Sequence, residues 1–433
     1  MRKTWVAALL VALQSTTLAG GAPGLSGLWQ GEMAFRGDQL PLALTVSEAG
    51  GEVTVLLDIP SLVYAQQPIP ASIAAGGGLE VELPFGIGQM SLARTTDGGL
   101  LASRDGFELT VARTEPPTVE QHIVRFGPRE RPLEGTLFVP GGCQPCPIVI
   151  VAAGSANANR NQWSYASWAR FYAGLGVGAF IYDRRPDLER LADGQIASIE
   201  DHASDLAQAI ETLRAREEVR ASHIGLVGSS RGAWIAMATA RADDRLAFVI
   251  LNSVAAASPA EQEVSSALTR MRRDGLNAAE LSEARAYLRL YFHVARSGQD
   301  WDSLEQRLQR YSGARWMEYV DQPRSLEDLA WWQANMDFDA ISALSALRMP
   351  VLAAWGGDDP ITPWANHRLV LEQALLVGGN ERVITRVYPQ ADHRMEVGFR
   401  TDEQGRWRWF GMAPGLLDDL GAFVRRHVGG VAP

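Results

Sequence analysis

Beyond Pro117 the sequence alternates between short apolar runs and segments with helical spacing, and this alternation limits the fold more than any other feature. Apolar runs separated by amphipathic helical segments are typical of βαβ units, which build a mostly parallel sheet with helices on both faces. The runs lie at residues 148–153, 177–182, 224–227, 246–251, 351–355 and 383–388. The sequence therefore predicts a doubly wound α/β domain over residues 118–433.

Two further patterns refine this domain. Residues 121–126 and 133–139 have the pattern of an antiparallel pair ahead of the first parallel strand. Ser198-Ile199-Glu200-Asp201 resembles a capping box, so we expect a helix to begin after Ser198.

The strand signal disappears between about residues 257 and 336, where helical segments rich in large aromatic side chains take its place. An insertion at this point would lie over the carboxyl ends of the parallel strands, where ligands bind in such sheets. We therefore expect a helical lid. Large aromatic residues at helical spacing belong to a core more often than to a pocket, and both interpretations stay open for these. The aromatic residues are Tyr311, Trp316, Tyr319, Trp331 and Trp332.

Residues 25–115 follow a different pattern, with apolar side chains at every second position. This period is typical of half-buried strands, and glycine pairs such as Gly50-Gly51 mark the turns between them. The pattern predicts a small antiparallel barrel or sandwich. Residues 114–117 (TEPP) have the composition of a linker to the α/β domain.

The first residues have the layout of a secretory signal peptide. Arg2 and Lys3 form a basic start, an apolar run extends to Leu13, and small residues end the segment at Ala19. The run is shorter than the ~20 residues of a spanning helix, which favours a cleaved leader over a membrane anchor. We expect a leader over residues 1–19 and an exported mature protein, periplasmic or secreted, without a membrane span.

The formal net charge of -10 restricts the partners of the protein. Nucleic acids and anionic membranes attract basic surfaces, so neither is expected as a partner.

The two cysteines, Cys143 and Cys146, form a C-x-x-C pattern directly before a predicted strand. Redox pairs of this spacing act at a helix start, and a zinc site would need a second pair of ligands. In an exported protein the spacing instead predicts a structural disulfide across a turn.

Residues 226–232 read LVGSSRG, and Gly228-Ser229-Ser230-Arg231-Gly232 fits the pattern G-x-S-x-G. The pattern alone is common, but here it stands between a predicted strand and a predicted helix. A strand, a sharp turn and a helix hold the central serine out at the tip of the turn. Ser230 is therefore the candidate nucleophile.

A serine nucleophile needs a base, and the base needs an orienting acid. On a parallel sheet of this kind they follow in the order serine, acid, histidine. Asp359 follows the apolar run 351–355, and His393 follows the run 383–388. Asp358 and Asp392 are alternative acids, but Asp359 stands three residues after Gly356 and directly before a proline. The predicted triad is Ser230, Asp359 and His393.

Acyl transfer through such a triad also needs two hydrogen-bond donors for the oxyanion. The backbone N–H of Arg231, directly after the nucleophile, is one candidate. The backbone N–H of Ser155, in the loop after the first parallel strand, is the other.

From about residue 118 to residue 428 the chain resembles the α/β-hydrolase superfamily. More narrowly, it is similar to bacterial exported esterases related to dienelactone hydrolases and to the prolyl oligopeptidase catalytic domain. The residues that carry the likeness are Val151-Ala152-Ala153-Gly154-Ser155, Arg160-Asn161, Tyr182-Asp183-Arg184-Arg185 and the serine, acid and histidine loops. The start of the leading domain, Gly27-Leu28-Trp29-Gln30-Gly31, is similar to the small domain found before some of these esterases.

The chain departs from the esterase pattern at three positions. Ala156 stands where a glycine is common, Pro186 follows Arg185 where a glycine is common, and Ser229 stands where histidine is common before the nucleophile.

The resemblance implies a serine carboxylic-ester hydrolase that acts on a small-molecule ester through an acyl-enzyme. A serine peptidase and an acyl thioesterase of the same fold are alternatives. A catalytically weak protein that binds a ligand through its leading β domain is an alternative of another class. No motif for a metal or cofactor is present, so none is expected.

Overall fold

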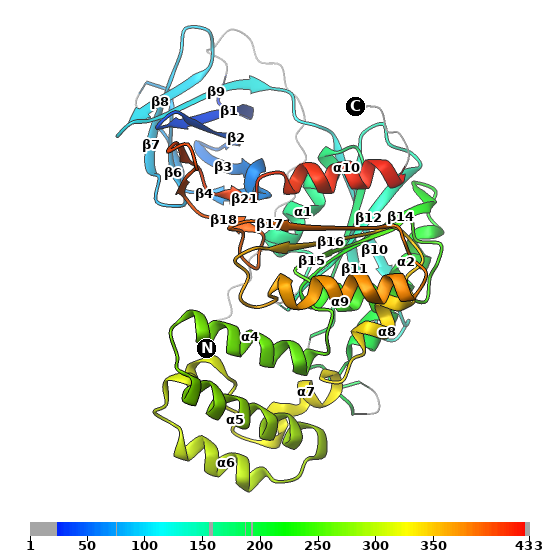
Figure 1. The fold of residues 1–433 in the computed structure, drawn as a ribbon. Helices are drawn as coiled ribbons and strands as arrows, with labels where there is room; N and C mark the ends of the chain where they lie inside the picture. The colour runs from blue at the N-terminus through cyan, green and yellow to red at the C-terminus, as the bar shows by residue number, and fades with distance from the viewer. Residues whose placement is uncertain (1–23, 75, 156–158, 187, 192–193, 429–433) are drawn as a thin grey trace, which may run out of the picture.

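Two large β-sheets organise the chain in the computed structural model, which describes residues 24–74, 76–155, 159–186, 188–191 and 194–428. Figure 1 shows the first sheet in blue and cyan, and the second sheet between layers of helices. The leader expected at residues 1–19 lies outside the described residues.

The first sheet has nine antiparallel strands in the order β4-β3-β2-β1-β9-β8-β7-β6-β5. Its two end strands follow each other in the sequence, and β5 also contacts β3, so the sheet is nearly closed into a barrel. Alternate side chains fill its interior, as the period-two pattern predicts. The strands are β1 (Gly27–Phe35), β2 (Asp38–Ala49), β3 (Glu52–Ile59), β4 (Tyr64–Ile69), β5 (Ala71–Ile73), β6 (Leu79–Leu83), β7 (Gly88–Arg94), β8 (Leu100–Arg104) and β9 (Phe107–Thr114).

The second sheet has eight strands in the order β10-β11-β13-β12-β14-β15-β16-β17. Its first two pairings are antiparallel and the others are parallel, so this is the expected α/β arrangement. The strands are β10 (Val119–Phe126), β11 (Leu133–Pro140), β12 (Cys146–Ala152), β13 (Gly178–Tyr182), β14 (Val219–Ser229), β15 (Phe248–Asn252), β16 (Val351–Gly356) and β17 (Val383–Tyr388).

Strand β14 begins five residues before the apolar run at 224–227 that predicts it. Residues 220–223 (RASH) precede the run and are mostly polar, yet they continue the strand, and Val219 pairs with Cys146 of β12 across a register shift. Hydrogen bonding to β12 therefore extends the strand beyond its apolar core.

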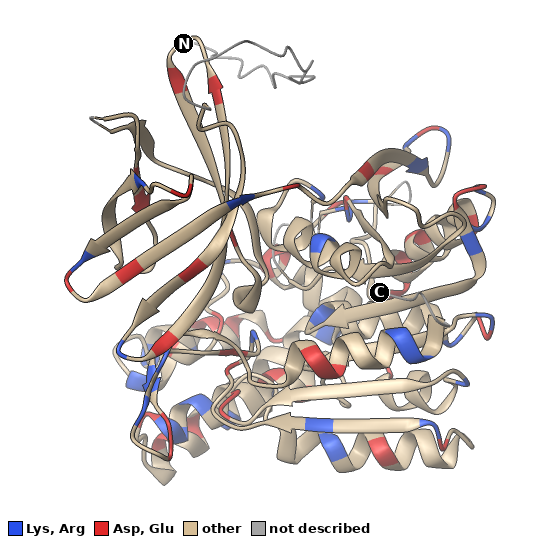
Figure 2. Ribbon diagram, turned by 90° about the horizontal axis from the view of Figure 1, so that it is seen from above, with Lys and Arg blue, Asp and Glu red and all other residues tan. Residues whose placement is uncertain are grey.

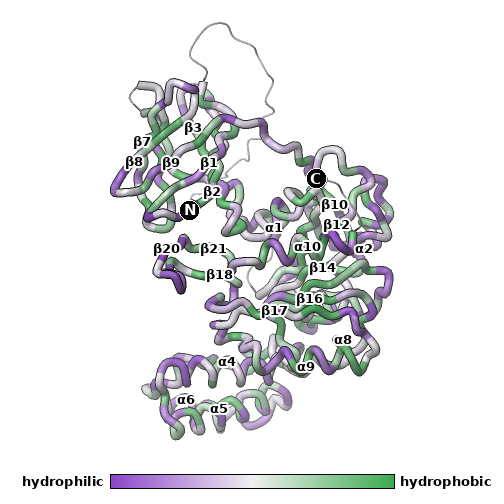
Figure 3. The backbone as a smooth tube through the Cα atoms, turned by 45° about the horizontal axis from the view of Figure 1, so that its top comes forward, coloured by the Kyte–Doolittle hydropathy of each residue, from purple (hydrophilic) through white to green (hydrophobic). Residues whose placement is uncertain are grey.

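Helices cover both faces of the second sheet (Figure 1). One face carries α1 (Trp163–Gly174) and α10 (Leu416–Val428). The other carries α2 (Ile199–Arg214), α3 (Arg231–Ala240), α8 (Ala340–Ser345) and α9 (Trp364–Val377). Figure 3 shows the central strands β14 and β16 in the hydrophobic colour, consistent with their burial between these layers. The capping box expected at Ser198 is present at the start of α2, with both of its hydrogen bonds.

A helical insertion lies between β15 and β16, where the sequence predicts a lid. It consists of α4 (Pro259–Arg273), α5 (Ala278–Ser297), α6 (Trp301–Arg310), the short helices η2 (Arg315–Tyr319) and η3 (Leu326–Leu329), and α7 (Ala330–Asn335). The insertion has a hydrophobic core of its own, in which Trp316 is fully buried.

After β17 the chain forms an arm over residues 396–412 that reaches the barrel. The arm contains two small ladders: β18 (Glu396–Val397) with β21 (Gly411–Met412), and β19 (Arg400–Thr401) with β20 (Trp407–Arg408). Trp409 enters the hydrophobic core of the barrel and is 6% exposed. Asp38 of β2 accepts hydrogen bonds from Arg408 Nη1 at 2.9 Å and from the Trp409 backbone N–H at 3.0 Å. The arm therefore joins the two domains.

Figure 2 shows acidic and basic residues interspersed over both domains. Within the described residues, no helix is both long and apolar enough to cross a membrane.

Candidate active site

Ser230 lies at a sharp turn between β14 and α3, with a φ of 55° and a ψ of -125°. A positive φ is unfavourable for a serine, and such strain is typical of residues that hold a reactive side chain at the tip of a turn. The flanking glycines are required by close packing. A Cβ on Gly228 would lie 2.3 Å from the Gly232 carbonyl oxygen, and a Cβ on Gly232 would lie 2.2 Å from the Ala152 carbonyl oxygen.

Ser230 lines a cavity of about 280 Å³ beneath the helical insertion, whereas the neighbouring Ser229 does not. The Ser230 backbone N–H donates to the Asn252 carbonyl at 2.9 Å, which ties the turn to the end of β15. The geometry of the turn therefore supports Ser230, rather than Ser229, as the serine of the candidate site.

Asp359 lies in the turn after β16, and its side chain accepts three hydrogen bonds from the two residues that complete the turn. The donors are the Ile361 N–H at 2.8 Å, the Thr362 N–H at 3.0 Å and the Thr362 hydroxyl at 2.5 Å. Burial alone would raise the pKa of Asp359, but the hydrogen bond and charge of His393, together with the Thr362 donors, hold this pKa below its usual value. The side chain is therefore a carboxylate at neutral pH.

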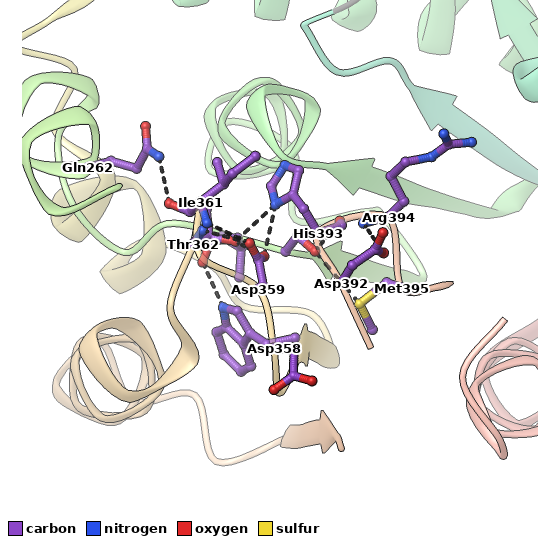
Figure 4. Close-up of polar contacts among 12 residues, drawn as sticks. Gln262, Asp358, Asp359, Ile361, Thr362, Asp392, His393, Arg394 and Met395 are labelled. Atoms are coloured by element: carbon purple, nitrogen blue, oxygen red, sulfur yellow. Dashed lines mark hydrogen bonds and ion pairs between the residues drawn. The ribbon is translucent and has the colours of Figure 1, made fainter. Parts of the chain in front are cut away.

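His393 follows β17, and its Nδ1 lies 2.8 Å from Asp359 Oδ2 (Figure 4). Because Asp359 is ionised, the Nδ1–H of His393 donates to it, which leaves Nε2 free to accept a proton. The Ser253 hydroxyl donates to the His393 carbonyl at 2.8 Å and fixes the backbone of the histidine loop.

The structure brings Asp359 and His393 into contact and places Ser230 in the adjacent cavity with Ser253. Among the described residues there is no hydrogen bond between Ser230 and His393. Such contacts are often long in unliganded enzymes and shorten when substrate binds, so the triad remains a prediction with two of its three members in contact.

The two candidate oxyanion donors, Ser155 and Arg231, line the same cavity as Ser230. Arg184 Nη2 donates to the Gly154 carbonyl at 3.1 Å. The C=O and N–H of a trans peptide point in opposite directions, so this bond turns the Ser155 N–H away from Arg184. Residues 156–158, which include the Ala156 departure, lie outside the described residues.

The arginines of the two flanking motifs stabilise the loops near the site. The Arg160 backbone N–H donates to Asp183 Oδ1 at 2.8 Å, and its side chain forms ion pairs with Asp183 and, at 2.6 Å, with Glu134. Arg185 pairs with the buried Asp205 at 2.5 Å. These motif residues hold the loops that surround the candidate nucleophile.

The helical insertion supplies much of the cavity wall. Trp331 and Trp332 of α7 line it, while Trp316 is buried in the core of the insertion. The aromatic residues of this region therefore include both pocket residues and core residues, the two interpretations that the sequence leaves open. The Arg231 guanidinium lies over the Trp331 ring, 4.1 Å from its centroid.

Two acidic side chains, Glu263 and Asp321, also line this cavity. Trp332 Nε1 donates to Asp321 Oδ2 at 3.2 Å. Burial raises the pKa of Glu263; Arg270 opposes this effect and Asp321 reinforces it.

Sequence reasoning missed Thr362, Ser253 and these two acids. Thr362 has a local signal, because an aspartate followed three residues later by a threonine commonly forms a side-chain-to-backbone turn. Ser253 directly follows β15, so its position at a strand end is a signal as well. Glu263 and Asp321 reach the site through tertiary packing alone.

The structure joins Cys143 and Cys146 by a disulfide at the start of β12, the end of the strand opposite the site. Within the described ranges, no group of three or more histidine, cysteine or acidic side chains is arranged to hold a metal ion.

A mixed sheet with a serine at a sharp strand-to-helix turn, followed by an acid and a histidine in later strand loops, defines the class of α/β hydrolases. A model of the Alpha/beta hydrolase family matches residues 137–404, and the chain belongs to this family. No curated protein matches the sequence at a significant level.

Three solved structures are similar to the chain at low sequence identity. A cold-adapted esterase from an Arctic intertidal metagenomic library is 14% identical over 71% of this chain and 96% of that chain, with a TM-score of 0.39. A dienelactone hydrolase from Anabaena variabilis is 16% identical over 71% and 96%, with a TM-score of 0.39. An esterase from Pyrococcus furiosus is 15% identical over 72% and 92%, with a TM-score of 0.44.

Proposed function

We propose that the protein is a serine hydrolase that cleaves a small-molecule carboxylic ester through an acyl-enzyme. The observation that carries the proposal is the 2.8 Å contact between His393 Nδ1 and Asp359 Oδ2 next to the strained turn of Ser230. A base held by a buried carboxylate beside a serine at the tip of a turn is the arrangement that activates a hydroxyl at neutral pH.

In the first half of the reaction, the Ser230 hydroxyl attacks the ester carbonyl and His393 Nε2 takes its proton. The backbone N–H groups of Ser155 and Arg231, residues that line the same cavity as Ser230, stabilise the oxyanion of the tetrahedral intermediate in this proposal. The bond to the leaving alcohol then breaks, and His393 returns the proton to the alcohol oxygen. In the second half, water replaces the alcohol and the same steps run in reverse to release the acid.

A fluorophosphonate probe tests which serine is the nucleophile. Ser230→Ala should abolish both labelling and hydrolysis of nitrophenyl esters, because no other hydroxyl lies at the tip of the turn. Ser229→Ala is the matched control and should keep the label. Labelling that persists in Ser230→Ala and disappears in Ser229→Ala would refute the proposed register.

A parallel assay with an aminoacyl nitroanilide and an acyl thioester separates the ester hydrolase from the peptidase and thioesterase of the same fold. We expect the ester to be cleaved fastest.

A further inference from the structure

A second cavity, of about 690 Å³, adjoins the candidate site on the side of His393. The first cavity contains Ser230, the second contains His393, and Ile361 borders both. The triad therefore lies between two separate spaces, one beneath the helical insertion and one between the hydrolase domain and the barrel.

The barrel and the arm form one wall of the second cavity. Leu62, in the short helix η1 (Pro60–Leu62) between β3 and β4, belongs to the barrel domain, and Phe410 belongs to the arm. Phe410 packs against Phe85 of the barrel with ring centroids 4.6 Å apart. Leu62 is the part of this wall that the barrel supplies, and it would be absent from a hydrolase domain without the barrel.

The chemistry of acyl transfer assigns the two spaces to different parts of an ester. The acyl carbon becomes bonded to Ser230 Oγ, so the acyl group stays in the cavity that contains Ser230. The C–O bond to the alcohol breaks as His393 Nε2 donates a proton to the alcohol oxygen, so the alcohol must lie on the histidine side.

We propose that the second cavity binds the leaving alcohol and that the barrel selects this alcohol through Leu62. The inference rests on the proposed ester hydrolysis and adds a role for the barrel domain in it.

The surface of the second cavity indicates the chemical class of the alcohol. Leu62, Val397 and Phe410 give it an apolar wall. Of the charged side chains nearby, Arg394 pairs with Glu396 at 3.0 Å, and Arg273 donates to the Asp358 carbonyl at 3.2 Å. Asp392 accepts hydrogen bonds from the Arg394 and Glu396 N–H groups at 2.8 and 3.0 Å, and the exposed Asp358 carboxylate adds a negative charge that disfavours an anionic group. The site therefore fits an apolar, uncharged alcohol of the size of benzyl alcohol better than a small or anionic one.

Two series of esters test the two cavities independently. In the first series the acyl group is always acetyl and the alcohol is methyl, butyl or benzyl. In the second series the alcohol is always methanol and the acid is acetic, butyric or phenylacetic acid.

Three variants are compared on these esters. Leu62→Trp fills the second cavity, and Leu62→Ala enlarges it with less risk to folding. Leu101→Trp, at an exposed position on β8 outside the cavity, is the matched control.

Leu62→Trp should lower kcat/KM for benzyl acetate by about tenfold or more, because a pocket discriminates by roughly that factor against a group that no longer fits. The same variant should lower kcat/KM for the methyl esters much less, because methanol occupies little of the second cavity. Leu62→Ala should shift the preference among alcohols and leave the preference among acids unchanged, and Leu101→Trp should alter neither series.

Partitioning of the acyl-enzyme gives an independent measurement. Added benzyl alcohol competes with water for the acyl-enzyme and must bind where the leaving alcohol departs. Leu62→Trp should therefore reduce the rate of transfer to benzyl alcohol much more than the rate of hydrolysis by water, so the transferred fraction falls.

Equal changes in both ester series, or a change confined to the acids, would overturn the assignment of the cavities. An enzyme that cleaves none of the esters and takes no fluorophosphonate label would instead overturn the proposed function.

Discussion

Asp358 and Asp359 are neighbours in the sequence but have different surroundings. Asp359 is 4% exposed and is hydrogen-bonded to His393 and Thr362. Asp358 is exposed, and its backbone rather than its carboxylate makes the contacts that hold it. Of these two carboxylates, Asp359 is the one in contact with the imidazole.

Asp359→Asn should reduce kcat by at least about 10²-fold, or roughly 2.7 kcal/mol of activation free energy, because an amide favours the wrong tautomer of His393. Asp358→Asn should keep nearly full turnover. Both variants are measured on one ester after circular dichroism shows that they are folded. A large loss in Asp358→Asn with a nearly normal Asp359→Asn would contradict the assignment of the acid.

At the scale of single residues, the sequence predicts those candidate site residues that lie just after a parallel strand. Ser230, Asp359 and His393 each follow an apolar run, and parallel strands bring their carboxyl ends to one edge of the sheet. Glu263 and Asp321 carry no such signal, because they lie in the helical insertion and reach the site by packing.

Among the elements, the central strands β12, β13, β15 and β16 are predictable because burial on both faces makes each a continuous apolar run. The arm over residues 396–412 is not predictable. Its strands are two residues long, and its stability comes from aromatic contacts with another domain rather than from local periodicity.

Trp409→Ala tests how far the arm supports the histidine loop. Removing a buried aromatic side chain typically costs about 3 kcal/mol or more, so the melting temperature should fall by several degrees. Turnover should fall as well, because the arm begins three residues after His393. Thermal unfolding and ester hydrolysis measure the two effects.

Leu101→Ala is the control for this change, since it removes a large apolar side chain from an exposed position of the barrel, 44% accessible. If Trp409→Ala has the same melting temperature and the same turnover as Leu101→Ala, the arm does not support the histidine loop.

For the whole molecule, the change from period-two to alternating patterns near Pro117 predicts both sheets. It does not predict how they pack together. The contact between Asp38 and Trp409 joins residues 371 positions apart, and no local sequence pattern predicts such a contact.

A buried histidine makes the stability of the molecule depend on pH. His367 of α9 is 2% exposed, and neither of its ring nitrogens has a hydrogen-bond partner among the described residues. Burial lowers the pKa of His367 to about 4, although the negative charge of Asp359 acts in the opposite direction. In the unfolded chain a histidine titrates near 6.5, so the unfolded state binds more protons between these values.

The resulting stabilisation is fully present above about pH 6.5 and is lost as the pH falls toward 4, and it amounts to roughly 3 kcal/mol. His367→Phe should therefore lose less stability than the wild type between pH 7 and pH 4.5. Urea unfolding of both proteins at the two pH values measures the difference. Identical pH dependence would show that His367 does not titrate in this window.

The position of Trp409 in the barrel core has a consequence for the order of events during synthesis. The barrel leaves the ribosome before the hydrolase domain, but its core lacks this indole until the arm that follows β17 has emerged. Domains usually complete their folding in order from the N-terminus, and long-range contacts form late. Here the barrel cannot complete its core until the strands of the second sheet have been made. A truncated chain that ends before the arm would thus have an incomplete barrel.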